Sequence, residues 1–374
     1  MKHDFRLYNV NIRKKVYFWK NKFTIMEKLI PFTINDLAKV THHRNGEIKF
    51  GEKMITVPKD KELSLFMKEC EAQYVLFGIP EDIGVRANFG RPGAASAWDC
   101  AIASIANIQH NRFCKGNQII VLGKLDVVKE MEAVKELDFT NINDRKKFSD
   151  LVEKIDKEVV YIISTIIKSG KTPIVIGGGH NNAYGNIKGT ALAKGKPINA
   201  INIDAHSDFR ILEGRHSGNG FNYAYQEGFL KKYFIFGLHE NYTSKNVLQI
   251  LKNIDDRVSY NTYDEIAIRK EKNFENELSK AFQFVNNDFY GLEIDLDAIP
   301  NIASSAMGPS GFSVEQVRQF IYHFAKSKNV SYLHICEGAP ELGEEKSKHL
   351  IGKLIGYMLT DFIKGNSSFH QKID

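Results

Sequence analysis

Hydrophobic positions along the chain fall into short continuous runs, separated by longer segments with a helical repeat. The runs are rich in β-branched and aromatic residues and apolar at nearly every position, which is typical of strands buried on both faces. Between them, apolar residues recur every three or four positions, as in amphipathic helices. The predicted strands are Tyr74–Pro80, Gln118–Leu122, Pro173–Ile176, Ile198–Ile203, Tyr233–Gly237, Phe289–Leu296 and Ser331–Cys336, and the predicted helices include Ala94–Gln109, Phe148–Lys168, Val314–Lys326 and His349–Lys364.

The alternation of strands and helices predicts an α/β fold, with one mainly parallel sheet covered on both faces. In such sheets the ligand crevice lies beyond the carboxyl ends of the strands. Four of the predicted strands run into polar clusters at this end, which are residues 177–180, 204–208, 295–297 and 337–340. We therefore expect the chemistry of the protein to gather there.

The spacing of these polar residues predicts a metal site. Side chains alternate in an extended segment, so Asp204, His206 and Asp208 can point one way, as can Asp295 and Asp297. Ionised carboxylates beside an apolar core need a cation to neutralise them. The full set is too large for one tetrahedral zinc and suits two harder cations, for which Mn²⁺ is the better candidate. The predicted metal ligands are His180, Asp204, His206, Asp208, Asp295 and Asp297.

Composition indicates a globular protein. Of the 374 residues, 43% are hydrophobic, enough for a substantial core. The four cysteines have no paired spacing, which predicts reduced thiols and a cytoplasmic location. The longest apolar-rich stretch, Val159–Ile167, is too short to span a bilayer, so we expect no membrane association.

The net charge of +6 comes from the start of the chain. Residues 1–25 hold seven of the 51 basic residues and one of the 45 acidic residues, so the rest of the chain holds 44 of each. A neutral body argues against a nucleic-acid-binding face. We expect residues 1–25 to be a disordered basic extension, with a targeting segment or a true start at Met26 as alternatives, and residues 26–374 to form a single catalytic domain.

The motifs GGGH, DAHSD and DLD resemble those of the ureohydrolase family, which contains arginases, agmatinases and formimidoylglutamases. The resemblance extends from about Tyr74 to Leu342. It implies a three-layer α/β/α sandwich, a binuclear manganese centre held by the six predicted ligands, hydrolysis of a C–N bond in a linear amidine, and a homo-oligomer. Glu337 in EGAP resembles the family's glutamate that receives the cationic amidine group, since a carboxylate can accept paired hydrogen bonds from a planar N–C–N cation.

Two segments are most similar to formimidoylglutamases: residues 84–94 (GVRANFGRPGA) and Arg210, directly after DAHSDF. Formimidoylglutamate carries two carboxylates, and Arg210 and Arg86 could bind them. Either arginine could instead be a structural ion-pair partner. Ser217 and Asn219 resemble the arginase residues that bind the substrate's α-carboxylate, so an arginase or another guanidino hydrolase is the alternative.

Three positions depart from the family pattern. Phe221 stands where arginases have a histidine proposed to shuttle protons, with His216 as a nearby substitute. Glu293 stands where the family usually has serine before the aspartate pair, and Pro300 follows without the usual third aspartate. None of these is a predicted ligand, so we expect an intact centre with altered supporting residues.

The resemblance to formimidoylglutamases implies conversion of N-formimidoyl-L-glutamate to L-glutamate and formamide, a step of histidine degradation. In that reaction Glu337 would orient the amidine, and Asp208 would give a proton to the leaving amine. A catalytically inert family member, acting as a metabolite sensor or scaffold, is the alternative from another class. The complete ligand set argues against it.

Overall fold

The computed structural model describes residues 29–254 and 256–370, so the predicted extension 1–25 and the predicted domain start at residue 26 lie outside the described residues. One sheet of ten strands has the order β1-β4-β3-β5-β10-β9-β6-β7-β8, with β2 also paired to β4. Only β1 runs antiparallel to its neighbour. The strands are β1 (Leu29–Pro31), β2 (Ile55–Thr56), β3 (Tyr74–Gly78), β4 (Ile119–Leu125), β5 (Thr172–Ile176), β6 (Ile198–Ile203), β7 (Leu230–Leu238), β8 (Val258–Thr262), β9 (Tyr290–Asp295) and β10 (Val330–Cys336).

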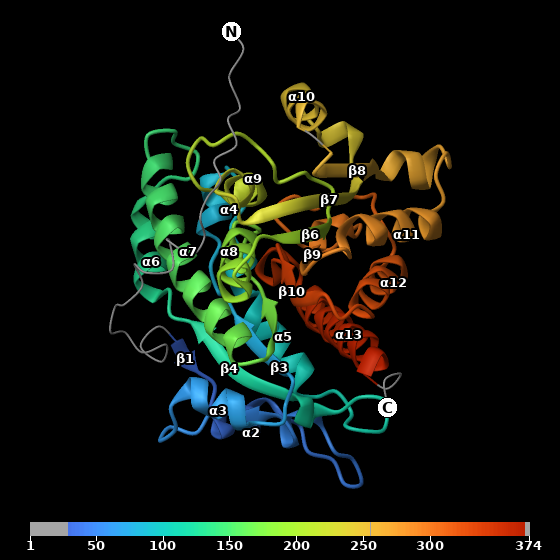
Figure 1. The fold of residues 1–374 in the computed structure, drawn as a ribbon. Coiled ribbons are helices and arrows are strands. Elements are labelled where there is room, and N and C mark those ends of the chain that lie inside the picture. The colour runs from blue at the N-terminus through green and yellow to red at the C-terminus, as the bar shows by residue number, and fades with distance from the viewer. Residues whose placement is uncertain (1–28, 255, 371–374) are drawn as a thin grey trace.

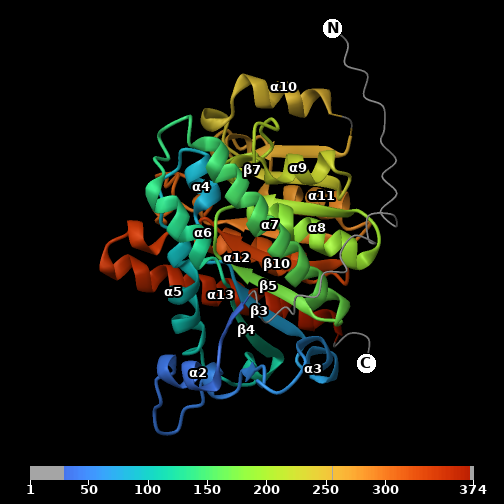
Figure 2. The same cartoon turned by 90° about the vertical axis from the view of Figure 1, so that its left-hand side faces the viewer.

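Helices cover both faces of this sheet (Figures 1 and 2). The buried side chains of α5 (Ala97–Ile105), α11 (Phe274–Val285), α12 (Val314–Ala325) and α13 (Glu345–His370) join one hydrophobic core. On the other face, α7 (Arg145–Lys168), α8 (Asn182–Lys194) and α9 (Gly220–Gln226) bury their apolar sides. The remaining helices are α2 (Ile34–Val40), α3 (Leu63–Glu69), α4 (Ile83–Ala87), α6 (Val128–Ala133) and α10 (Lys245–Asn253). The predicted three-layer α/β/α sandwich is confirmed.

All seven predicted strands are present, and the differences lie at the edges of elements. The strands β1, β2 and β8 were not predicted, because they are short or carry polar residues and lie at or near the sheet margins. The helices α7 and α13 begin earlier than predicted, since their first turns are polar and lack the apolar repeat. Among the described residues, no helix is long and apolar enough to cross a membrane.

The four strands that end in polar clusters are neighbours at the centre of the sheet. The order β5-β10-β9-β6 places Ile176 beside Ile335, Ile335 beside Ile294, and Ile294 beside Ile203. Because these strands are parallel and in step, all four clusters begin at the same edge, with neighbouring strands about 4.8 Å apart. The connection from β6 to β7 and the connection from β9 to β10 run in opposite directions across the sheet, so the neighbouring strands β6 and β9 form a switch point, where α/β folds open a crevice.

A buried arginine fixes the loop that follows β6. Arg215, 2% exposed, donates from Nε and Nη2 to the two carboxylate oxygens of Asp156 on α7, at 2.8 and 3.2 Å. It also donates to Asn219 Oδ1 and to the backbone oxygen of Asn181, both at 2.9 Å. This one guanidinium therefore joins α7, the start of α8 and the 204–219 loop.

We expect Arg215→Met to lower the free energy of unfolding by about 3–5 kcal/mol, because Asp156 would remain buried as an unpaired charge. Urea denaturation followed by circular dichroism measures this. Lys135→Met is the matched control, since it breaks an exposed pair with Glu132 and should change stability by less than about 1 kcal/mol. Equal effects of the two substitutions would contradict the anchoring role of Arg215.

Candidate metal centre

A glycine turn after β5 carries His180 into the centre. Gly177 and Gly178 adopt left-handed backbone conformations, with φ of 87° and 75°. A Cβ on Gly178 would lie 2.4 Å from the Asn182 amide nitrogen, so a side chain there would collide with the start of α8. The turn therefore requires glycine, and it leaves His180 fully buried.

A buried carboxylate, Glu81, holds this turn from below. Its Oε1 accepts from the backbone N–H of Gly179 at 3.2 Å and from the side-chain amides of Asn181 and Asn182 at 3.1 and 2.5 Å. Burial raises the pKa of Glu81, while these donors oppose the shift. Asn181 occupies the N-cap position of α8, but its side chain makes no capping hydrogen bond and donates to Glu81 instead.

Four of the predicted ligands surround a first position. His180 Nδ1 lies 3.3 Å from Asp204 Oδ2, 2.8 Å from Asp208 Oδ2 and 3.1 Å from Asp295 Oδ2. Each of the four residues offers a ligand atom, and these atoms all lie within 4.8 Å of one another. Asp208 reaches this position with a left-handed backbone, φ 45°, which is a strained conformation for a non-glycine residue.

A second position adjoins the first. His206 Nδ1 lies 3.0 Å from Asp297 Oδ2 and 3.6 Å from Asp204 Oδ1. Asp204 thus belongs to both groups, with Oδ2 facing the first and Oδ1 facing the second. The structure brings together all six predicted ligands in two adjacent sets that share one carboxylate.

The donor chemistry of these sets fits two divalent cations. Burial, together with the negative charge of Asp204, raises the pKa of Asp208 to about 6. Asp297 Oδ1 is buried and has no hydrogen-bond partner among the described residues. Four buried carboxylates and two imidazoles carry more negative charge than their own hydrogen bonds offset, and oxygen-rich sets of this kind suit hard cations such as Mn²⁺.

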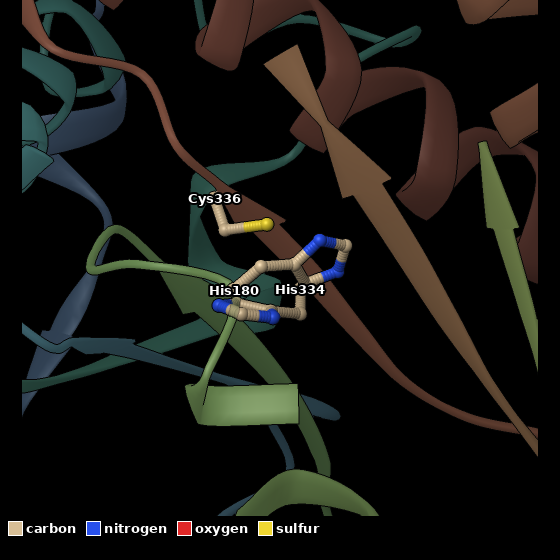
Figure 3. A group of neighbouring side chains, drawn as sticks. All are labelled: His180, His334 and Cys336. Carbon is tan, nitrogen blue, oxygen red and sulfur yellow. The ribbon is translucent and has the colours of Figure 1, made fainter. Parts of the chain in front are cut away.

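His180 also belongs to a third group of possible ligands (Figure 3). Nitrogen or sulfur atoms of His180, His334 and Cys336 lie within 4.8 Å of one another. However, His334 Nδ1 lies 2.6 Å from Glu293 Oε2, and its Nε2 lies 3.3 Å from the Gly177 carbonyl oxygen. Both nitrogens of His334 are therefore committed to hydrogen bonds, and we assign no metal to this group.

The carboxylate of Glu293 is ionised despite its burial. Burial opposes the charge, but His334 and His180 hold the pKa of Glu293 at about 2. Tyr332 donates its hydroxyl to Glu293 Oε1 at 2.6 Å. Glu293 therefore places a full negative charge directly behind the predicted ligand His180.

A cavity of about 530 Å³ opens onto the two sets of predicted ligands. Glu337 faces it with a left-handed backbone, φ 60°, and is almost fully buried. Its Oε1 accepts from the backbone N–H of His180 at 2.8 Å, and its Oε2 accepts from the Ser305 hydroxyl at 3.1 Å. Burial raises the pKa of Glu337 to about 8. Other lining residues are Asn88, His206, Asp208, Arg210, Glu213, Ser217, Tyr242, Asn246, Asp295 and Asp297.

Besides Glu337, two of the predicted substrate-binding residues line this cavity. The Arg210 side chain is 44% exposed and donates to Asn88 Oδ1 at 2.9 Å and to Glu213 Oε1 at 2.8 Å. Ser217 Oγ accepts from the Asn88 amide at 3.3 Å. Arg210 and Ser217 are thus held side by side by Asn88 at the cavity wall.

The other two predicted substrate-binding residues, Arg86 and Asn219, are outside the cavity lining. Arg86 on α4 donates from Nε to Asp82 Oδ1 at 2.7 Å, so the structural alternative holds for it. Asn219 is fully buried; its Oδ1 accepts from Arg215 and its amide donates to the Gly214 carbonyl oxygen at 2.8 Å. The contacts of both residues with substrate stay predictions, and the structure gives each residue another partner: Arg86 pairs with Asp82, and both polar atoms of the Asn219 side chain bond within the protein.

The substitute for the missing arginase histidine is also absent from the cavity lining. Phe221 is buried and stacks on Tyr233, with ring centroids 4.3 Å apart. His216 is buried, accepts from the Gly218 N–H at 3.1 Å and contacts Glu213 at 3.3 Å. Burial and the charge of Arg210 lower the pKa of His216 to about 3. His216 is therefore a structural residue of the loop.

Several residues of the site were not predicted from the sequence. Glu81 directly follows an apolar strand and Pro80, the same signal that identified the metal ligands, and could have been found that way. Asn88 lies within the segment that suggested Arg86. Glu213 and Ser305 lie in polar loops, where neither periodicity nor a motif distinguishes them from solvent-exposed residues.

The Arginase family profile matches residues 72–360. The formimidoylglutamase of Macrococcus caseolyticus is 26% identical over 303 residues, which cover 78% of this chain and 85% of that protein. The crystal structure of formimidoylglutamase from Bacillus subtilis is similar in fold, with a TM-score of 0.69 at 18% identity, covering 88% of this chain and 95% of that one. Formiminoglutamase from Trypanosoma cruzi, solved with Mn²⁺₂, gives a TM-score of 0.65 at 18% identity, covering 85% and 98%. Because the family match spans most of the chain and includes every predicted ligand, this protein belongs to the arginase family.

Proposed function

We propose that this protein is a binuclear manganese hydrolase that converts N-formimidoyl-L-glutamate to L-glutamate and formamide, a step of histidine degradation. The observation that carries the proposal is the pair of ligand sets sharing Asp204, which open onto a cavity faced by Glu337. Membership of the arginase family and similarity to formimidoylglutamases support the same reaction. The Trypanosoma cruzi protein solved with Mn²⁺₂ supports the choice of metal.

The two sets assign a place to each ion. His180, Asp204, Asp208 and Asp295 would hold one ion, and Asp204, His206 and Asp297 would contribute to the other. When bound, the two ions lower the pKa of water to near neutrality and so supply the nucleophile for hydrolysis. Asp208 and residues outside the two sets would then act on the substrate.

Glu337 is suited to hold the amidine group. Each of its oxygens accepts one hydrogen bond, from the His180 N–H and from Ser305, which leaves lone pairs directed at the cavity. A planar N–C–N cation can donate to both oxygens at once, and these charge-assisted bonds would fix the orientation of the carbon to be attacked. Asp208 also lines the cavity. We propose that it transfers a proton to the nitrogen of the departing glutamate as the C–N bond breaks.

The far wall of the cavity is suited to a carboxylate. Arg210 is the one arginine or lysine among the described residues that line it, and Asn88 and Ser217 lie beside it. A guanidinium binds a carboxylate through two parallel hydrogen bonds, which a neutral side chain cannot match. The substrate would thus span the cavity, with its cationic end on Glu337 and its anionic end near Arg210.

A guanidino hydrolase is the second candidate, and Ser217 favours it because this residue of the arginase-like segment does face the cavity. Two observations weigh against it. Asn219 of the same segment is buried and bound to Arg215, and Phe221 packs in the core where a proton-shuttling histidine would stand.

We also propose a cytoplasmic, homo-oligomeric enzyme. All four cysteines are free thiols, which agrees with a reducing compartment. The homo-oligomer rests on the family resemblance alone, and gel filtration with light scattering tests it.

The substrate proposal predicts turnover of formimidoylglutamate by purified protein reconstituted with Mn²⁺. A panel of formimidoylglutamate, arginine, agmatine and guanidinobutyrate, assayed for formamide and urea, measures it. We expect formamide from the first compound and no urea from the others. Urea from arginine without formamide from formimidoylglutamate would favour the guanidino hydrolase.

The shared ligand predicts different metal contents in two variants. His206→Ala removes a residue of one set only, so about one Mn²⁺ per chain should remain, whereas Asp204→Asn weakens both sets and should leave less than one. Metal analysis after gel filtration measures the content. Glu213→Gln, which lines the cavity outside both sets, should retain two ions. Retention of two ions by His206→Ala would contradict the assignment.

If Arg210 binds the carboxylate of the substrate, its replacement should weaken substrate binding. We expect Arg210→Met to raise the KM for formimidoylglutamate about 30-fold, with a smaller change in kcat, because a charge-assisted hydrogen bond contributes about 2 kcal/mol. Steady-state kinetics measure both constants. Arg86→Met is the control and should leave KM within about threefold, since Arg86 is paired with Asp82 outside the cavity lining. The reverse pattern would make Arg86 the substrate residue.

A further inference from the structure

The two ring nitrogens of His180 face different surroundings. Nδ1 lies among the carboxylates of the first set, 2.8 Å from Asp208 Oδ2. Nε2 is buried, has no hydrogen-bond partner among the described residues, and lies 3.6 Å from Glu293 Oε2. An imidazole that binds a metal through Nδ1 carries its proton on Nε2. In the metal-bound protein that proton points toward Glu293.

Glu293 is held rigidly in this position by two side chains of β10. Tyr332 donates to Oε1 and His334 Nδ1 lies against Oε2, both at 2.6 Å, and all three residues are fully buried. The register of the sheet makes this possible, because His334 pairs directly with Glu293. A Cβ on Gly291 would lie 2.1 Å from the Tyr332 ring, so the glycine provides the space through which the phenol reaches the carboxylate.

His334 also connects Glu293 to the turn that carries His180. Its Nε2 lies 3.3 Å from the Gly177 carbonyl oxygen, and its ring meets the His180 ring edge-on with centroids 6.1 Å apart (Figure 3). The position of Glu293 relative to His180 is therefore set from β9, β10 and the glycine turn together.

We propose that Glu293 is a positioning residue for the metal centre: it accepts the Nε2 proton of His180, fixes the ring with Nδ1 toward the first set, and strengthens Nδ1 as a ligand. This rests on the proposed binuclear centre. Closing the 3.6 Å separation between Nε2 and Oε2 requires a shift of several tenths of an ångström by His180, which ends the glycine turn just before α8. A carboxylate offers two acceptor oxygens at this place, where the family's usual serine offers one hydroxyl.

The two ions should consequently differ in affinity. The ion held by His180 would have the Glu293 carboxylate behind its imidazole, within a largely buried set. The other histidine, His206, is 33% exposed at its side chain and has an aromatic neighbour, Tyr242, at 6.1 Å between ring centroids. We therefore expect the first ion to be released last when a chelator is added.

A purely structural role is the competing explanation for Glu293. In that case the Glu293–His334 pair would only join β9 to β10, and its loss would lower stability without distinguishing between the ions. The two explanations differ in one observable, the separate affinities of the two ions.

The decisive experiment compares wild type with Glu293→Gln and Glu293→Ser. The dissociation constants of both Mn²⁺ ions are measured by chelator competition, and the spin-coupled Mn²⁺ pair is followed by electron paramagnetic resonance. We expect both variants to lower the affinity for the ion held by His180 about 10- to 100-fold, and the affinity for the other ion less than about threefold. At a Mn²⁺ concentration that just saturates the wild-type protein, the resonance spectrum of the variants should show isolated Mn²⁺ in place of the spin-coupled pair.

Two tyrosine variants serve as the matched pair. Tyr332→Phe keeps the carboxylate but removes one of the donors that hold it, so the same ion should be weakened to a smaller degree. Tyr290→Phe removes a buried hydroxyl on the opposite face of β9, which donates to the Phe324 carbonyl oxygen at 2.5 Å, and should leave both affinities unchanged. If the Glu293 variants do not fold, the contrast between the two tyrosine variants decides the question.

The outcomes separate this inference from the proposed function. Two unchanged affinities in Glu293→Gln, or equal weakening of both ions, would overturn the positioning role while leaving the binuclear centre intact. A wild-type protein that binds no Mn²⁺ would overturn both proposals.

Discussion

Negative charge buried at the ends of apolar strands is the constraint on which the rest of this structure depends. Asp204, Asp208, Asp295 and Asp297 lie in two adjacent groups, where they are largely buried. Such a group persists in a folded protein only if cations and hydrogen-bond donors offset its charge. The fold meets this requirement by bringing four parallel strands to the same level, so that ligands from distant parts of the sequence arrive at one place.

The same constraint explains the residues around the ligands. Glu81 stabilises the turn that presents His180, because it accepts hydrogen bonds from a backbone N–H and two asparagine amides of that turn. Glu293, behind His180, is also a buried carboxylate, and hydrogen bonds from Tyr332 and His334 stabilise it there. Each of these buried carboxylates is thus stabilised by polar groups of the neighbouring strands and turns.

The sequence was sufficient to predict the central sheet and the six side chains that gather at its carboxyl edge, because both depend on local patterns. A run such as residues 290–294 shows its buried strand directly, and the aspartates that follow at two-residue spacing show which side chains share a face. The wall of the cavity depends instead on how loops fold over the sheet. Asn219 and Arg86 look like substrate residues in the sequence, yet each contacts a residue four positions earlier, Arg215 and Asp82 respectively. The sequence contains these partners, but it does not show whether a side chain turns toward its neighbour or toward the cavity.

The 204–219 loop makes metal binding and substrate recognition interdependent. Its first residues supply the predicted ligands Asp204, His206 and Asp208, and its later residues supply Arg210 and Ser217 to the lining of the cavity. Arg215, between the loop and α7, fixes the distance between these two ends through Asp156 and Asn219. A change at Arg215, which does not line the cavity, would therefore shift the ligands and the cationic wall relative to each other. A buried ion pair outside the cavity therefore helps to determine the shape of the loop that carries both groups of residues.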